Sequence, residues 1–60
     1  MNTVQVEYCG RESREVLKIA EHCAEMADNA ERAEHLFYST LAANGFKGEA
    51  GASVCFIDIA

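Results

Sequence analysis

The residues of this chain with the most distinctive chemistry are its three cysteines and two histidines, Cys9, His22, Cys23, His35 and Cys55. Zinc sites in proteins use these ligand types, typically at short spacings such as C-x2-C or H-x3-H. No pair in this chain has such a spacing. His22 and Cys23 are adjacent and would project about 100° apart from a helix, a poor geometry for holding one ion. The spacing therefore predicts no metal site, and a Cys/His metal-binding module is kept as an alternative.

The same residue types could also form a nucleophilic cysteine–histidine pair. A reactive thiolate needs a neighbouring base and an electropositive setting, whereas this chain has ten acidic and only five basic residues. Sixty residues are also too few to build a substrate cleft as well as a core. Cys23 falls among apolar residues and is interpreted as a small core side chain. We therefore expect a non-enzymatic protein with no catalytic residue.

Glutamate-rich helices build di-iron carboxylate sites when they carry a Glu-x-x-His pair on one face. The positions three residues before His22 and His35 hold Ile19 and Arg32 instead of glutamate. This pattern excludes the di-iron interpretation, and we expect no cofactor.

A group of acidic residues is the strongest candidate for a binding surface. On one continuous helix Glu21, Glu25 and Asp28 would lie within about 60° of each other on the outer side, with Glu31 beyond them. Such a face favours a protein partner that carries a basic patch, because complementary charge steers association. A face that is merely solvated would have the same composition. Both interpretations stay open.

These residues belong to a stretch from Glu12 to Asn44 that contains no Gly and no Pro. At about 100° per residue its apolar side chains share a sector of about 140°, which is typical of a core-facing helix. The stripe comprises Val16, Ile19, Ala20, Cys23, Met26, Ala27, Ala30, Ala33, Phe37, Tyr38 and Leu41. The pattern predicts one long helix over residues 12–44, or two helices broken near Asp28-Asn29, with Asp28 capping the second.

The flanks of this stretch predict two strands and the helix ends. Apolar residues alternate with polar ones over residues 3–9, the period of a half-buried strand, and residues 52–59 form a second, better buried one. Ser13 is the expected N-cap of the helix, and Gly45 the expected left-handed residue after its end. The fold class is therefore α+β, strand–long helix–strand, in a single domain of residues 1–60.

The length of the helix bears on the oligomeric state. An unbroken helix over residues 12–44 would be about 50 Å long, whereas the connection over residues 46–51 spans only about 20 Å. The two strands would then pair between chains, in an intertwined homodimer held by the apolar stripe. A break near Asp28-Asn29 would instead allow the strands to pair within one chain. We favour the dimer, because the apolar phase continues across Asp28-Asn29.

The overall composition limits the function classes. A net charge of −5 opposes binding to nucleic acid and to anionic membranes. The N-terminal residues do not resemble a secretory signal, which predicts a cytoplasmic protein with reduced thiols. In length and acidity the chain resembles the small accessory proteins that bacteriophages use against host machinery. We expect an inhibitor, adaptor or regulator that acts by protein–protein interaction. The alternative is a nucleic-acid-binding dimer of strand-plus-helix type, in which Gln5 and Glu7 would lie on the outer face of the first strand.

Overall fold

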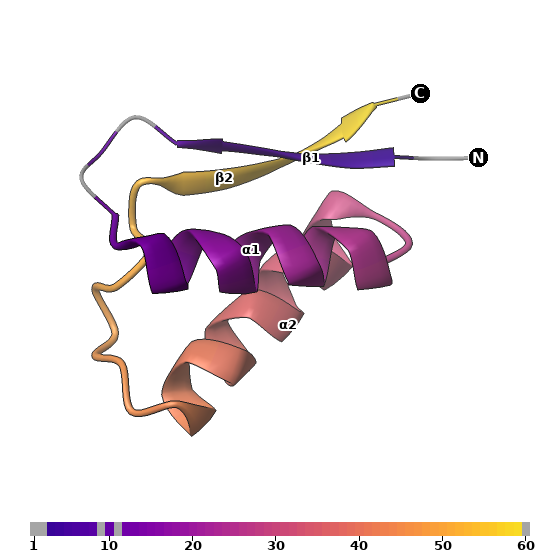
Figure 1. The fold of residues 1–60 in the computed structure, drawn as a ribbon. Helices are drawn as coiled ribbons and strands as arrows, with labels where there is room; N and C mark the ends of the chain where they lie inside the picture. Colours follow the sequence, from indigo (N-terminus) through magenta and orange to yellow (C-terminus); the bar gives the residue numbers. More distant parts are fainter. Residues whose placement is uncertain (1–2, 9, 11, 60) are drawn as a thin grey trace.

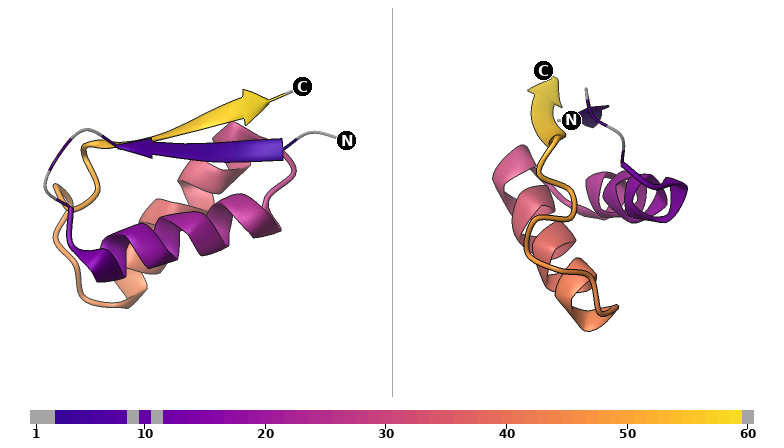
Figure 2. Two further views of the ribbon diagram at one scale, coloured as in Figure 1. Left: turned by 45° about the horizontal axis from the view of Figure 1, so that its top comes forward. Right: turned by 90° about the vertical axis from the view of Figure 1, so that its left-hand side faces the viewer.

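Two helices lie beneath a two-stranded sheet in the computed structural model, which describes residues 3–8, 10 and 12–59 (Figures 1 and 2). The elements are β1 (Thr3–Tyr8), α1 (Arg14–Met26), α2 (Ala30–Ala43) and β2 (Val54–Ile59). The strands pair antiparallel within the chain, from Thr3 opposite Ile59 to Tyr8 opposite Val54. The predicted α+β class is confirmed. The favoured single helix over residues 12–44 is wrong, and the structure shows the alternative, two helices with a break near Asp28-Asn29.

The break between the helices is made by polar capping. Ala27 leaves the helix with an extended backbone (φ −96°, ψ 150°), and Asn29 is extended as well (φ −155°, ψ 170°). The Asn29 side chain accepts the backbone N–H of Arg32 at 2.8 Å, so Asn29 caps α2 rather than Asp28. A straight helix of about 50 Å would also exceed the longest dimension of the molecule, 32 Å. Folding back lets both halves bury their apolar sides under one sheet.

A contact from β2 fixes the start of α2. The Asp58 carboxylate accepts the backbone N–H of Ala30 at 2.7 Å. The first N–H groups of a helix have no partner within the helix, and negative charge is favourable near them. This contact joins the bend to the end of the sheet.

The outer ends of the two helices follow the sequence prediction. The Ser13 hydroxyl accepts a backbone N–H from the first turn of α1 at 3.2 Å, as an N-cap does. Gly45 has φ +82° after the end of α2. Its N–H donates to Ala42 at 3.1 Å, and the Phe46 N–H donates to Leu41 at 3.0 Å. These bonds form a Schellman motif, which satisfies the last carbonyl groups of the helix.

The core lies between the sheet and the two helices. Phe37 is its largest fully buried side chain and makes edge-on contacts with Tyr38 and Phe56, with ring centroids 5.1 Å and 5.3 Å apart. The buried hydrophobic residues are Val4, Val16, Ala20, Cys23, Ala24, Ala33, Phe37, Leu41 and Val54. Three further stripe residues, Ile19, Ala27 and Ala30, are half-buried at its margin.

Two residues assigned to the apolar stripe lie at the surface. Met26 is 63% exposed and Tyr38 is 40% exposed. Met26 is the last residue of α1. The chain bends directly after it, so no further helical turn covers its side chain. Tyr38 is partly held by a hydrogen bond from its hydroxyl to the Gly51 carbonyl at 3.4 Å.

The connection from α2 to β2 passes through the edge of the core. Gly51 is buried with φ +82°, and a Cβ there would lie 2.6 Å from the Phe37 ring. The Glu12 carboxylate accepts the N–H groups of Gly51 at 3.1 Å and Ser53 at 3.2 Å. Glu12 therefore holds the chain just before it enters β2. With β1 and β2 paired in one chain, the geometric argument for pairing between chains no longer applies.

Candidate functional site

The four acidic residues of the predicted binding surface are all exposed, but they do not share one helix face. Glu21 and Glu25 lie on α1, Asp28 lies in the bend, and Glu31 lies in the first turn of α2. The predicted face assumed a continuous helix, and the break at residues 27–29 redirects its second half. Glu21 and Glu31 line two different hollows of the surface.

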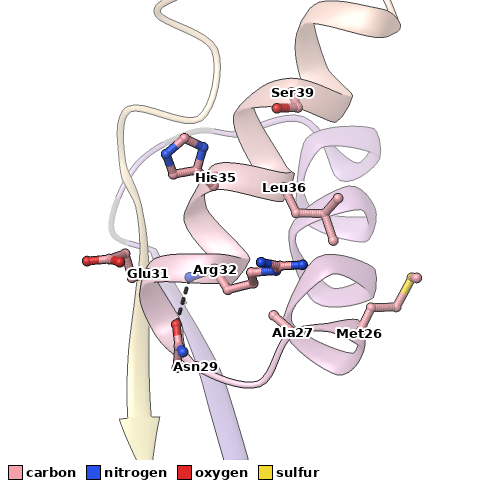
Figure 3. A pocket seen from close by; sticks show the side chains of 8 residues that line it. All are labelled: Met26, Ala27, Asn29, Glu31, Arg32, His35, Leu36 and Ser39. Carbon is pink, nitrogen blue, oxygen red and sulfur yellow. Dashed lines mark hydrogen bonds between the residues drawn. The ribbon is translucent and has the colours of Figure 1, made fainter.

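The larger hollow, here called the inter-helix hollow, lies where α1 ends and α2 begins, and has a volume of about 740 Å³ (Figure 3). Arg32 and Leu36 extend from α2 toward α1, and Met26 projects from the end of α1 (Figure 3). Its lining residues are Met26, Ala27, Asn29, Glu31, Arg32, His35, Leu36 and Ser39. The lining mixes apolar side chains with polar and charged ones.

Met26 gives this hollow its most distinctive feature. A methionine at 63% exposure is flexible and polarizable, and such side chains are common at binding surfaces that adapt to a partner. Exposed Glu25 and Asp28 flank it in sequence, and Glu31 lines the same hollow. The hollow therefore combines an exposed apolar side chain with charges of both signs, because Arg32 lines it together with Glu31.

A second hollow, here called the β1–α1 hollow, lies between β1 and the first turns of α1 and has a volume of about 280 Å³. Tyr8 is 54% exposed beside it. Its lining residues are Val6, Tyr8, Arg14, Leu17, Lys18 and Glu21. Sequence reasoning weighed only the acids on this helix and missed the two cations. The signal that could have found them is their spacing from the acids, with Arg14, Lys18, Glu21 and Glu25 recurring every three or four residues.

Among the described residues, the cysteines and histidines are dispersed. Cys23 is buried in the core, and burial raises the pKa of its thiol. Cys55 is exposed on the outer face of the sheet, and His22 is exposed on α1. His35 lines the inter-helix hollow, and Cys9 lies outside the described residues. Within residues 3–8, 10 and 12–59, no three His, Cys, Asp or Glu side chains are placed to hold a metal ion together.

The first strand presents polar side chains on its outer face. Thr3, Gln5 and Glu7 are exposed on the side of the sheet away from the helices, whereas Val4 is buried against them. Gln5 is therefore accompanied by a carboxylate, which repels the phosphates of a nucleic acid. No helix in the described part of the chain combines the length and the apolar character that crossing a membrane requires.

Comparison of the chain with protein-family models, with curated proteins and with solved structures finds no match.

Proposed function

We propose that this chain is a non-enzymatic cytoplasmic protein that self-associates and acts by binding another protein, as an inhibitor, adaptor or regulator. The observation that carries the proposal is the exposed Met26 at the inter-helix hollow, on a chain with a net charge of −5. Interfaces typically place an apolar anchor at the centre and polar groups at the rim. A partner of this surface would insert an apolar side chain beside Met26 and present a basic patch to the carboxylates.

The charge of the molecule supports a basic partner. A net charge of −5 on sixty residues attracts a positively charged surface and raises the rate of encounter. Asp28 and Glu31 lie on either side of the α2 cap, where Asn29 fixes the backbone. The two carboxylates are therefore attached to a backbone that the start of α2 holds in place, so that less conformational entropy is lost on binding.

The test is capture of partners by the immobilised chain, followed by affinity measurements on the main captured protein. We expect the double variant Asp28→Lys, Glu31→Lys to weaken binding at least roughly tenfold, because two attractive contacts become repulsive. Met26→Gln should weaken it as well, since the anchor becomes polar.

The matched control is Glu15→Lys, Glu49→Lys. It changes the net charge by the same amount, and Glu15 lies in the first turn of α1 as Glu31 lies in that of α2. Equal binding by the wild type and the Asp28→Lys, Glu31→Lys variant would show that this surface is not the partner site.

A further inference from the structure

The bend between α1 and α2 consists of only three residues, Ala27, Asp28 and Asn29. It contains no glycine or proline, and no non-glycine residue of the described chain has a positive φ. Helical hydrogen bonds reach both sides of the bend. The Ala27 N–H donates to the Cys23 carbonyl and the Ala33 N–H to the Asn29 carbonyl, each at 3.0 Å. The backbone therefore leaves the helical path over a very short stretch, made of residues that can also be helical.

The closed bend is held by two side-chain acceptors. Asn29 accepts the N–H of Arg32 at 2.8 Å, and Asp58 accepts that of Ala30 at 2.7 Å. If a helix continued through the bend, both N–H groups would instead donate to the carbonyl groups four residues earlier. Asp and Asn oppose a helix only weakly. The closed bend and the continued helix therefore satisfy the same two donors in different ways.

The two halves of the chain, β1 with α1 and α2 with β2, build one core between them. Both clusters of buried side chains contain members from each half, and the sheet joins the halves as well. Neither half can bury its apolar side chains alone, so a half that swings away must pack against the same surface of a second copy. The members from the first half are Val4, Val16, Ala20, Cys23 and Ala24, and those from the second are Ala33, Phe37, Leu41 and Val54.

The apolar phase of the sequence continues through the bend. Ala27 follows Cys23 by four residues and Ala30 follows Ala27 by three, so a continued helix would place them on the buried side of α1 and α2. A bent chain does not require this continuity, because each helix can turn its own apolar side to the sheet. The bend lies at one end of the molecule (Figure 1), so an opened half would extend away from the rest of the chain.

We propose that residues 27–29 are a hinge, and that the surface each half presents to the other also binds the corresponding half of a second copy. In this exchanged dimer the hinge continues the helix, and β1 and α1 of one chain pack against α2 and β2 of the other. Two-fold symmetry repeats the arrangement. β1 still pairs with β2 and still lies over α1, so the contacts between the halves recur between chains. The inference rests on the self-association in the proposed function and gives it a structural route.

Two hinge variants should shift the equilibrium between monomer and dimer in opposite directions. Asp28→Ala, Asn29→Ala removes a cap and favours a helix through the bend, so the dimer dissociation constant should fall at least roughly a hundredfold. Ala30→Pro suits the closed bend, because proline is favoured at the first position of a helix and the extended Asn29 precedes it. In a continued helix this proline would clash with the preceding turn. Its dimer should therefore be at least roughly tenfold weaker than that of the wild type.

A disulfide across the sheet shows which chains are joined. Glu7 lies opposite Cys55 in the strand register, and both are exposed. Opposite residues of antiparallel strands are close enough for a disulfide. Oxidised glutathione should therefore link positions 7 and 55 of a Glu7→Cys variant in a Cys9→Ser background. The bond closes within one chain in the monomer and joins two chains in the exchanged dimer, and denaturing electrophoresis without reductant separates the two products.

The Glu7→Cys, Cys9→Ser pair of substitutions is combined with each hinge variant, and the mass is followed by light scattering over a concentration series. The dimer of the Asp28→Ala, Asn29→Ala chain should give a covalent dimer. The monomer of the Ala30→Pro chain should give a chain closed on itself, which controls for random cross-linking. Circular dichroism reports whether each variant is folded. Comparison of the wild-type hinge with Ala30→Pro decides the question even if the double alanine variant fails to fold.

Three outcomes would each overturn the proposal. The first is a folded Asp28→Ala, Asn29→Ala chain that stays monomeric up to roughly 1 mM. The second is a dimer whose disulfides all close within single chains, and the third is an Ala30→Pro chain that dimerises as tightly as the wild type. A dimer without exchange would leave the self-association of the proposed function standing. All readings come from purified chains, so failure of partner capture leaves the exchanged dimer intact.

Discussion

The two connections beneath the sheet are fixed in opposite ways. The bend between α1 and α2 is held at the surface by two side-chain oxygens, from Asn29 and Asp58. The connection before β2 is fixed by the core, because Gly51 packs so closely on the Phe37 ring that a Cβ would lie 2.6 Å from it. The Glu12 carboxylate also accepts hydrogen bonds from two backbone N–H groups of this connection. A surface cap can be replaced by water at modest cost, whereas a backbone in contact with the core has no room to adjust. The second connection should therefore be the more sensitive of the two.

The largest effect is expected from Gly51→Ala. Its φ of +82° disfavours any Cβ, and the new carbon would lie 2.6 Å from Phe37 and 3.2 Å from Leu41. We expect a loss of about 3 kcal/mol or more, from strain combined with overpacking. The loss in the free energy of unfolding can be measured by urea denaturation.

Two other glycines are matched controls for that variant. Gly45→Ala has the same φ of +82° but nothing within 4 Å of the new Cβ, and should lose only about 1 kcal/mol. Gly48→Ala has neither constraint and should be near neutral. Similar losses for Gly51→Ala and Gly45→Ala would show that contact with Phe37 does not limit this connection.

Glu12→Gln should have the next largest effect. A carboxylate can accept both N–H groups, whereas an amide offers one oxygen and turns an NH2 donor toward the other N–H. One part-buried donor is left without a partner, so we expect a loss of about 1–3 kcal/mol. Glu15→Gln on the exposed side of α1 is the control. Equal stability of the two variants would contradict the role of Glu12 as the clamp of residues 51–53.

Substitutions at the bend between α1 and α2 should lower the free energy of unfolding less. Asn29→Ala and Asp58→Ala each remove one capping oxygen and should each lose about 1 kcal/mol. The two caps serve different N–H groups, those of Arg32 and Ala30. Hydrogen exchange at these two amides should rise selectively in the matching variant. A loss as large as that of Gly51→Ala would reverse the ranking of the two connections.

The smallest effect on stability is expected from the ionisation of Cys23 in the core. Burial raises the folded-state pKa of the Cys23 thiol, so the unfolded chain releases this proton at a lower pH than the folded chain does. Stability is therefore unaffected below the ordinary thiol pKa and declines as the pH rises above it. Urea unfolding at neutral and alkaline pH should show this decline, and Cys23→Ala should reduce it. In a Cys9→Ser background, Cys55 should react with a thiol reagent long before Cys23.

Local chemistry made much of the fold predictable from the sequence. The alternation in residues 3–9, the cap at Ser13 and the left-handed Gly45 each depend on near neighbours. The sequence indicated the break near Asp28-Asn29 only as an alternative, because both helices face one core and keep one apolar phase, and because Asp and Asn within a helix cost only tenths of a kcal/mol. Met26 was misplaced for the same reason. Arg14 and Lys18 could not be assigned to a surface hollow from the sequence, because only the tertiary packing of β1 against α1 places Val6 and Tyr8 beside them.

The pairing of Thr3 with Ile59 has one more consequence. It brings the two ends of the described chain side by side, where β1 begins and β2 ends (Figure 1). A short glycine-rich linker would therefore close the backbone into a ring without disturbing either strand. A new opening between Lys47 and Gly48, which are exposed and precede the segment held by Glu12, would yield a circular permutant with the same core. In this permutant β2 and β1 would be joined by the new linker as a hairpin. The strand pairing with the largest sequence separation in the original chain would then have the smallest.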